Sequence, residues 1–437
     1  MRWTSGRPAG DHAILRARCA PWCERLTVSE REMKVTMAIP SYWGRSKGEG
    51  WQEGDAVYDH PTPLDEDGTL RRALESLSIL ENKDFNLVVL AVATADEIQE
   101  AVEDKVSSIV RGVDSDVETL VFSHSHLARL QERLEAEGMA KLNGLLALRG
   151  YSNIRNLCVL LPHILGSDVA ILIDDDEIFE EPSFMDKAVE FIGREIDGRR
   201  VLAVAGYYVN PDGDYLLNGE VLPWMTEWNK IGCMNRAFEA VIATEPRLQE
   251  TPFVFGGNMV VHRDLFTQIP FDPAVTRGED IDFLMNARMF GYAFYLDKQL
   301  SIKHAPPPKS HPKWKQLRED IYRFVFEKAK IDSQKDVPGM TRLRAEDLDP
   351  YPGEFLRDDL QERIFRSNQM LAVEYLLEGD SEGARECMRN IYLAKYDAPP
   401  SADPFEDLLA VRNGWKKIMA YLSEVSKARE LRRLIWG

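Results

Sequence analysis

Short apolar runs alternate with helix-forming segments in the first half of the chain, and this alternation most constrains the fold. Continuous apolar stretches, typical of strands buried on both faces, occur at residues 34–40, 86–94 and 169–173. Residues 69–80, 95–113 and 154–165 carry apolar side chains at helical spacing. Strands that alternate with helices form a parallel sheet with helices on both faces. The sequence therefore predicts an α/β fold with a mostly parallel central sheet.

The second half of the chain has a different pattern. We expect strands at 201–209 and 293–304, a helix over 279–292, and a strand, a glycine turn and a short helix start within 253–266. From about His311 to Gly437 the pattern predicts only helices. Three parts follow: an N-terminal extension (1–33), a sheet domain (34–310) and an all-helical C-terminal region (311–437).

Charge and cysteine usage narrow the function classes. The formal net charge of −18 repels nucleic acid and anionic lipid, so neither is an expected partner. We find no long uncharged apolar run, and therefore expect no transmembrane segment. The five cysteines are odd in number and scattered, which favours a reducing compartment, the cytoplasm. The sequence leaves both a monomer and a homo-oligomer open.

Three consecutive aspartates, Asp174, Asp175 and Asp176, follow the apolar run at 169–173. Ligands of open parallel sheets bind outside the carboxyl ends of the strands. Carboxylates at such an edge repel one another and can hold a divalent cation, which leaves coordination positions for substrate phosphates. The alternative is a solvated turn in which one aspartate caps a helix.

Three weaker signals come later in the chain, and each has an ordinary structural interpretation. Glu279 and Asp280 precede a helix, where acids also favour the helix dipole. His304 ends a strand-like segment, and a single histidine is more often a plain surface or core residue. Residues 256–258 (Gly-Gly-Asn) let backbone approach a ligand closely, or form a tight turn.

The order of these pieces resembles that of the GT-A glycosyltransferases, especially the large family-2 group, over about residues 34–308. A first strand ends in a motif similar to I-P-x-Y, and a segment similar to G-x-x-x-A-R-N precedes the metal strand. A D-x-D-like motif, a glycine-containing acceptor loop, an E-D pair before a helix ending in G-Y, and a closing histidine then follow. The matching residues are Ala38 to Tyr42, Gly150 to Asn156, Asp174 to Asp176, Phe255 to Asn258, Glu279 with Asp280, Gly291 with Tyr292, and His304.

The resemblance implies a Rossmann-like GT-A fold and a metal-dependent transfer of a hexose from a UDP- or GDP-sugar to a hydroxyl of a small-molecule or glycan acceptor. It implies that Asp176, His304 and Asp174 hold Mn²⁺ or Mg²⁺, with Mn²⁺ favoured by the imidazole ligand. The donor-binding residues implied by the resemblance are Pro40, Ser41, Tyr42, Asp96, Arg155, Asp174 and Asp175.

The resemblance also implies catalytic and acceptor-binding residues. Asp280, with Glu279 second, is expected to act as the base on the acceptor hydroxyl if the reaction inverts the anomeric centre. The chain is also similar to the mannosylglycerate and glucosyl-3-phosphoglycerate synthases, which retain configuration and in which these acids would position a substrate. Acceptor binding is expected at Gly256, Gly257, Asn258 and Trp224, although Trp224 fits a core position equally well.

Two departures from the family pattern and two other functions stay open. The loop at 44–68 is longer than usual, and is either a lid over the sugar or a surface excursion. The acid expected to read the donor base is displaced to Asp96 or Glu97, so the preferred base is undetermined. A sugar-phosphate nucleotidyltransferase would need a glycine-rich phosphate loop after the first strand, which is not evident. A non-catalytic sugar-binding protein would share the scaffold without the activity.

Overall fold

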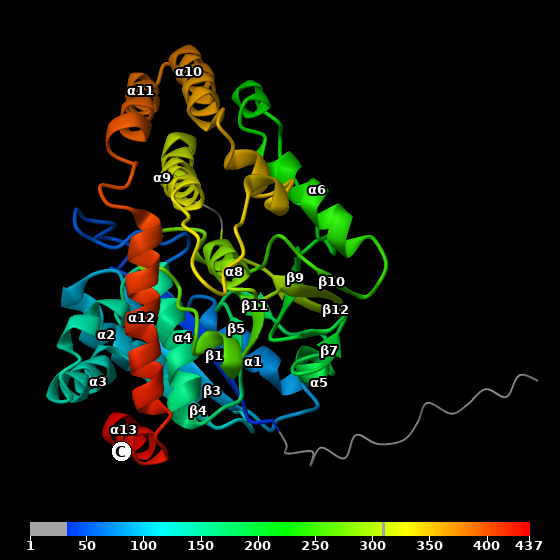
Figure 1. Ribbon diagram of the computed structural model, residues 1–437. Helices are drawn as coiled ribbons and strands as arrows, with labels where there is room; N and C mark the ends of the chain where they lie inside the picture. Colours follow the sequence, from blue (N-terminus) through cyan, green and yellow to red (C-terminus); the bar gives the residue numbers. More distant parts are fainter. Residues whose placement is uncertain (1–32, 308–310) are drawn as a thin grey trace, which may run out of the picture. The chain divides into compact units, whose positions relative to one another are not determined.

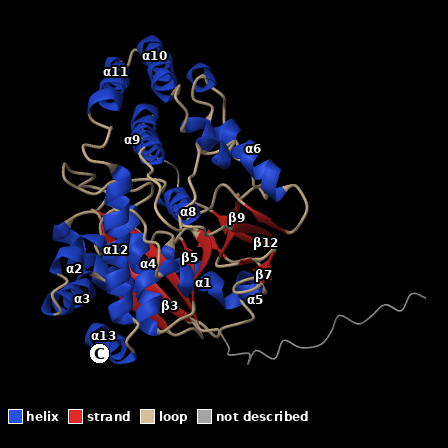
Figure 2. Ribbon diagram, viewed as in Figure 1, coloured by secondary structure: helices blue, strands red, loops and turns tan. Residues whose placement is uncertain are grey.

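A single mixed sheet organises the chain within residues 33–307 and 311–437, the ranges that this computed structural model describes (Figures 1 and 2). Its strands lie in the order β10-β12-β9-β11-β5-β1-β3-β4, with β2 beside β1 and β6 beside β12. The strands are β1 (Val35–Gly44), β2 (Thr62–Pro63), β3 (Asn86–Ala93), β4 (Thr119–Phe122), β5 (Val169–Ile173), β6 (Glu177–Ile178), β9 (Ala203–Val209), β10 (Leu248–Glu250), β11 (Asn258–His262) and β12 (Tyr295–His304). A separate two-stranded ribbon pairs β7 (Glu195–Ile196) with β8 (Arg199–Arg200).

The sheet divides into a parallel half and a mixed half. Strands β5, β1, β3 and β4 are parallel neighbours, and the three continuous apolar runs of the sequence form β1, β3 and β5. Strand β11 runs antiparallel to both β5 and β9, whereas β9 and β12 are parallel. The expected α/β fold is thus confirmed, and its parallel part ends at β5.

Helices surround this sheet, as expected (Figure 2). Helix α4 packs on β1 and β5, α2 packs on β3, and α5 packs on β12. The helices are α1 (Leu70–Ser76), α2 (Gln99–Gly112), α3 (His124–Ala136), α4 (Tyr151–Leu165), α5 (Phe184–Glu190), α6 (Lys230–Ile242), α7 (Arg263–Phe266), α8 (Glu279–Met289), α9 (Lys313–Asp332), α10 (Leu360–Leu377), α11 (Ser381–Tyr396), α12 (Pro404–Leu422) and α13 (Val425–Trp436).

One segment differs from the sequence expectation, and a helix forms in another for which the pattern predicts no element. Within 253–266 the strand follows the two glycines instead of preceding them, because residues 258–262 are the ones that pair with β5 and β9. Residues 224–252, which show no clear period as a whole, contain α6. The irregular flanks of α6 mask its short apolar face, which is formed by Cys233, Ala237, Phe238, Val241 and Ile242.

The predicted all-helical C-terminal region packs back on the sheet. The indole Nε1 of Trp415 in α12 donates to the carbonyl of Phe266 at 2.7 Å. The indole Nε1 of Trp436 in α13 donates to the carbonyl of Val121 in β4 at 2.9 Å. Residues 34–437 form one compact unit, so the expected boundary at 310 and 311 stays a prediction. The N-terminal extension, Met33 excepted, lies outside the described residues.

A buried charge cluster joins α9 to α8. The ammonium of Lys330 is fully buried and lies 2.7 Å from Asp272 and 2.6 Å from Asp282. Removing one partner of a buried ion pair leaves a charge without compensation, at a cost of about 3–5 kcal/mol. The C-terminal region therefore holds α8, the helix that begins with Glu279 and Asp280.

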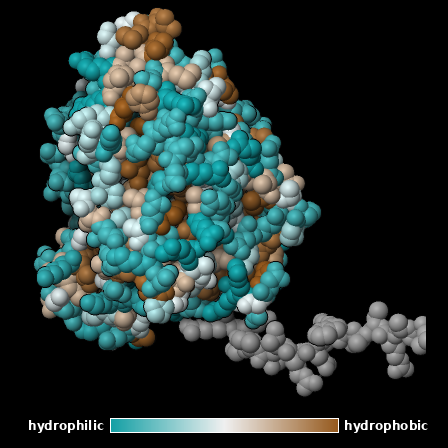
Figure 3. Space-filling view, turned by 45° about the horizontal axis from the view of Figure 1, so that its top comes forward, coloured by the Kyte–Doolittle hydropathy of each residue, from teal (hydrophilic) through white to brown (hydrophobic). Residues whose placement is uncertain are grey.

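The remaining features concern membrane-spanning helices, cysteines and exposed apolar residues. No helix in the described ranges is long and apolar enough to cross a membrane. Cys158, Cys233 and Cys387 are free and buried, while Cys19 and Cys23 lie outside the described residues. Apolar residues gather at the top of the molecule, where α10 and α11 lie (Figure 3). The exposed large apolar and aromatic residues of these two helices are Phe365, Val373, Leu376, Leu377, Met388, Tyr392 and Tyr396.

Candidate active site

Four consecutive carboxylates follow β5 at the centre of the sheet. The chain turns after Asp174, Asp175 and Asp176 and enters β6, which pairs with the end of β12 so that Glu177 lies opposite His304. The imidazole Nε2 of His304 consequently lies 3.5 Å from a carboxylate oxygen of Asp176. Sheet register therefore brings together two residues that are more than a hundred positions apart in the chain.

The neighbouring aspartates have different partners. Asp174 lies 2.8 Å from the Arg155 guanidinium, and Asp175 accepts a 2.6 Å hydrogen bond from the Ser41 hydroxyl of β1. Burial, then repulsion from Asp176, raises the pKa of Asp175 to about 8, against the opposing effect of Ser41. Burial likewise raises the pKa of Asp174, while Arg155 opposes the shift. Burial and mutual repulsion therefore disfavour full ionisation of the triplet unless a cation is present.

This donor set fits a divalent cation that is bound partly by substrate. Within residues 33–307 and 311–437 there is no group of three His, Cys, Asp or Glu side chains that could hold a metal ion alone. Asp176 and His304 offer one oxygen and one nitrogen ligand, and diphosphate oxygens commonly complete such sites. Gly257 lies against the same acids. An added Cβ there would come within 2.0 Å of Glu177 Oε1 and 2.6 Å of Asp174 Oδ2.

Arg155 links the aspartates to the second acidic pair. Its side chain, projecting from α4, is buried, and its Nε lies 3.3 Å from Glu279 on α8. Burial, then repulsion from Asp280, raises the pKa of Glu279 to about 7, and Arg155 opposes this shift. One guanidinium therefore bridges carboxylates from β5 and α8.

The glycine loop before β11 lies between these acidic groups. The Gly256 N–H donates to Asp280 Oδ2 at 3.1 Å, and the Gly257 N–H donates to Tyr208 Oη at 2.8 Å. A Cβ on Gly256 would come within 2.9 Å of Arg155 Nη2. Tyr208 in turn stacks on His304, with ring centroids 4.6 Å apart. The loop thus needs glycine at both positions to let the acids approach.

Three other expected site residues, Pro40, Tyr42 and Asn258, pack within the sheet or against aromatic rings. Tyr42 packs against Tyr58 and Tyr151, and Pro40 is buried within β1. Asn258 is buried in the sheet and donates to the Leu300 carbonyl at 3.1 Å.

Two of the expected residues, Asp96 and Trp224, have contacts in other parts of the fold. Asp96 is exposed and accepts a hydrogen bond from Gln99. Trp224 is buried in the 3₁₀ helix η4 (Pro223–Thr226), which packs on α10. No hydrogen bond or ion pair among the described residues joins Asp96 or Trp224 to the aspartates.

The sequence did not predict two residues of the candidate site, Glu177 and Arg323. Glu177 directly follows the triplet, but its position opposite His304 depends on the β6–β12 pairing, which leaves no sequence signal. Arg323 of α9 packs on Gly278, the residue before Glu279: an added Cβ would lie 2.2 Å from the guanidinium carbon. The ion pair with Glu327 and a hydrogen bond to Tyr351 hold Arg323 in place. Arg323 and Gly278 are far apart in the chain, so no motif or spacing in the sequence predicts their contact.

We expect Gly278→Ala to unfold the protein more readily than Gly291→Ala. Both glycines have positive φ, +74° and +84°, which costs alanine about 1 kcal/mol. Only Gly278 also meets buried Arg323 atoms, whereas nothing lies within 4 Å of a Cβ on Gly291. Denaturant unfolding should give a loss of about 2–4 kcal/mol for Gly278→Ala and about 1 kcal/mol for Gly291→Ala. Equal losses would mean that Arg323 does not constrain the start of α8.

Comparison with known proteins finds no matching family model and no matching curated protein. Solved structures do show likeness. A mannosyltransferase from Pyrobaculum calidifontis, in complex with GDP-Man and Mn²⁺, is 15% identical over 90% of this chain and 86% of that one, with a TM-score of 0.44. A mycobacterial protein is 15% identical over 67% of this chain and 73% of that one, with a TM-score of 0.36.

A third solved structure is GalNAc-T7 with UDP, GalNAc and Mn²⁺. It is 13% identical to this chain over 84% of this chain and 59% of its own, with a TM-score of 0.33. All three TM-scores lie below 0.5, so these likenesses carry no argument about activity.

Proposed function

We propose that the chain is a metal-dependent glycosyltransferase of the GT-A type, which transfers a hexose from a UDP- or GDP-sugar to a hydroxyl acceptor. The observation that carries the proposal is the approach of His304 to Asp176 at the carboxyl end of β5, beside the bridge from Arg155 to Asp174 and Glu279. Asp176 and His304 would hold Mn²⁺ or Mg²⁺. When bound, such an ion neutralises the charge that develops on a departing nucleoside diphosphate.

The chain's own residues have distinct proposed roles. Ser41 orients Asp175 by a hydrogen bond, and Arg155 keeps Asp174 and Glu279 in place. Asp280, oriented by the Gly256 N–H, is the proposed base or positioning group for the acceptor hydroxyl. The free thiols of Cys158, Cys233 and Cys387 support a reducing compartment, the cytoplasm.

A donor screen tests the proposal directly. The purified chain is incubated with Mn²⁺ and UDP-Glc, UDP-Gal, UDP-GlcNAc or GDP-Man, and release of nucleoside diphosphate is measured. Thermal unfolding is followed in parallel with Mn²⁺ and UDP or GDP. We expect one donor to be turned over and its nucleotide to raise the melting temperature. If no nucleoside diphosphate stabilises the protein with either metal, the proposed function is wrong.

The two alternative functions have less support. A nucleotidyltransferase would need free basic groups in the loop after β1 to bind phosphates. Arg45 instead pairs with Asp55 and Glu97, and Lys47 pairs with Glu66. A non-catalytic sugar-binding protein would bind ligand in the same screen and release no diphosphate.

The pH dependence of transfer should reflect Glu279. Its pKa is raised to about 7, and Arg155, Asp174 and Asp280 are the charged groups around it. Below pH 7 the carboxyl is protonated and the ion pair with Arg155 is lost, so kcat/KM should fall by up to about tenfold per pH unit. The profile is measured for the wild type and for Glu279→Gln, which lacks this titration. An inflection near pH 7 that persists unchanged in Glu279→Gln would contradict the assignment.

A further inference from the structure

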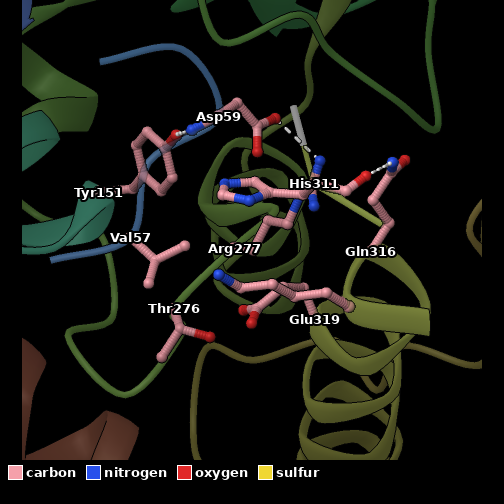
Figure 4. Close-up of a pocket in the computed structure, with 9 residues that line it drawn as sticks. Val57, Asp59, Tyr151, Thr276, Arg277, His311, Gln316 and Glu319 are labelled. Carbon is pink, nitrogen blue, oxygen red and sulfur yellow. Dashed lines mark hydrogen bonds and ion pairs between the residues drawn. The ribbon is translucent and has the colours of Figure 1, made fainter. Parts of the chain in front are cut away.

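A polar pocket lies outside the acidic site, between the 44–68 loop, the residues before α8 and the start of α9 (Figure 4). Its enclosed part measures only about 20 Å³, and the space between its lining residues reaches about 450 Å³ when the part open to solvent is included, so it is an open depression. Asp59 comes from the loop, and Tyr151 lies in the first turn of α4. Arg277 lies two residues before α8. His311 lies just before α9, and Lys315 and Glu319 lie in its first two turns. Four distant parts of the chain thus supply polar groups to one cavity.

The pocket adjoins the proposed site of transfer. Arg277 lines the pocket, and only Gly278 separates it from Glu279. Tyr151 and Arg155 are four residues apart on α4 and therefore lie on the same face of the helix. The Tyr151 ring also packs edge-on against Tyr42, which follows Ser41 on β1. A molecule in the pocket would consequently lie beside the acids at the start of α8.

The loop at 44–68 forms a fixed wall of this pocket. The Asp59 N–H donates to the Tyr151 hydroxyl at 2.7 Å, and the Gly150 N–H donates to the Tyr58 hydroxyl at 3.0 Å. Arg277 lies 2.8 Å from Asp59. These bonds to the start of α4 and to Arg277 hold residues 58 and 59 of the loop against the rest of the fold.

The charges that line the pocket cancel. Arg277 and Lys315 oppose Asp59 and Glu319, and burial lowers the pKa of His311, which keeps it neutral near pH 7. Glu319 makes no hydrogen bond or ion pair with the described residues, and its partial burial raises its pKa. The Lys315 ammonium lies 5.2 Å from the ring centroid of Trp51, whose side chain is exposed. The pocket therefore offers both hydrogen-bond donors and acceptors, and the net charge of its lining side chains is close to zero.

We propose that this pocket binds the acceptor and that the acceptor is an uncharged polyhydroxyl compound, such as the end of a glycan. Hydroxyl groups both donate and accept, so they can satisfy Glu319 and Asp59 together with Lys315 and Arg277. An anionic acceptor would instead meet the unpaired carboxylate of Glu319, which costs binding energy. This inference rests on the proposed function, because it assigns the acceptor side of that reaction.

The test uses matched uncharged and anionic acceptors with the full chain. Methyl glucoside, methyl galactoside and methyl mannoside are compared with methyl glucuronide, which differs from the glucoside by one carboxylate. Binding is measured by saturation-transfer NMR in the presence of Mn²⁺ and the nucleotide that stabilises the protein, and transfer is measured by mass spectrometry. We expect at least one neutral glycoside to bind, and the glucuronide to bind at least tenfold more weakly than the glucoside.

The matched variants are Glu319→Gln and Glu378→Gln. Glu319 lines the pocket, whereas Glu378 is exposed at the end of α10. Loss of the charged hydrogen-bond acceptor in Glu319→Gln should weaken glycoside binding about ten- to hundredfold. The stabilisation by Mn²⁺ and nucleotide should persist in both variants, and Glu378→Gln should bind glycoside like the wild type.

The failures of the two proposals are distinguishable. If Mn²⁺ and nucleotide stabilise the wild type but no neutral glycoside binds, or if the glucuronide binds better than the glucoside, the acceptor assignment is overturned and the proposed function stands. Unchanged glycoside binding by Glu319→Gln would place the acceptor elsewhere. A lack of any nucleotide stabilisation would instead remove the function on which the inference rests.

Discussion

Replacing Asp176 with alanine should abolish the thermal stabilisation by Mn²⁺ and nucleoside diphosphate, and should lower transfer on the order of a thousandfold. Asp176 is the member of the triplet that faces His304, at 3.5 Å from the imidazole. Since no group of three candidate ligands exists among the described residues, loss of either partner leaves a single ligand from this pair. The cation and the diphosphate that it grips should then be lost together.

The control for this experiment is Glu180→Ala. Glu180 lies four residues further on and makes only a partly exposed ion pair with Lys303. Such a pair contributes about 0–1 kcal/mol, so the variant should keep both nucleotide binding and transfer. His304→Ala should behave like Asp176→Ala. Full Mn²⁺-dependent stabilisation of the Asp176 variant, checked by differential scanning fluorimetry, would refute the assigned ligand pair.

Asp280→Asn should reduce transfer about 10²- to 10⁴-fold while leaving nucleotide binding unchanged. The amide oxygen can still accept the Gly256 N–H, so the loop should stay in place, whereas the charge and the hydrogen bond that Asp280 accepts from the Ile281 N–H are lost. The acid is needed to remove or orient the acceptor proton, a demand that arises after the donor has bound. Initial rates and nucleotide-dependent melting shifts on the same preparation separate the two effects.

A surface aspartate in a similar local setting provides the control. Asp264 lies in the first turn of α7 and pairs with Arg200 on the surface, so Asp264→Asn should retain wild-type transfer. Wild-type turnover by Asp280→Asn would exclude a chemical or positioning role for this carboxylate. Anomeric analysis of the product would then distinguish inversion from retention for the wild type.

Local pattern alone was enough for the parallel half of the sheet and for its acidic edge. The apolar run at 169–173 coincides with β5, and the aspartates follow it at the carboxyl end, as expected for a buried parallel strand. Helices at 69–80, 95–113 and 154–165 also appear, with ends shifted by a few residues or divided by 3₁₀ turns. These features depend on residues that are close in sequence, where periodicity and turn chemistry act directly.

The environments of the site residues depended on long-range packing. The approach of His304 to Asp176 follows from the pairing of β6 with β12, and Arg323 reaches Gly278 from a helix near the C-terminus. Asn258, expected in an acceptor loop, is buried in β11 because the strand begins at that residue. Side-chain burial and charge pairing are properties of the folded chain, so they cannot be predicted from the spacing of residues in the sequence.

The sequence by itself therefore determined the α/β class, the acidic edge of the sheet and the order of the candidate motifs, because each arises from adjacent residues. Only the tertiary structure decided which acid meets which partner, raised the pKa of Glu279 to about 7, and built the pocket between the loop, α8 and α9. The physical reason is that desolvation and pairing act between groups that the backbone brings together from distant positions.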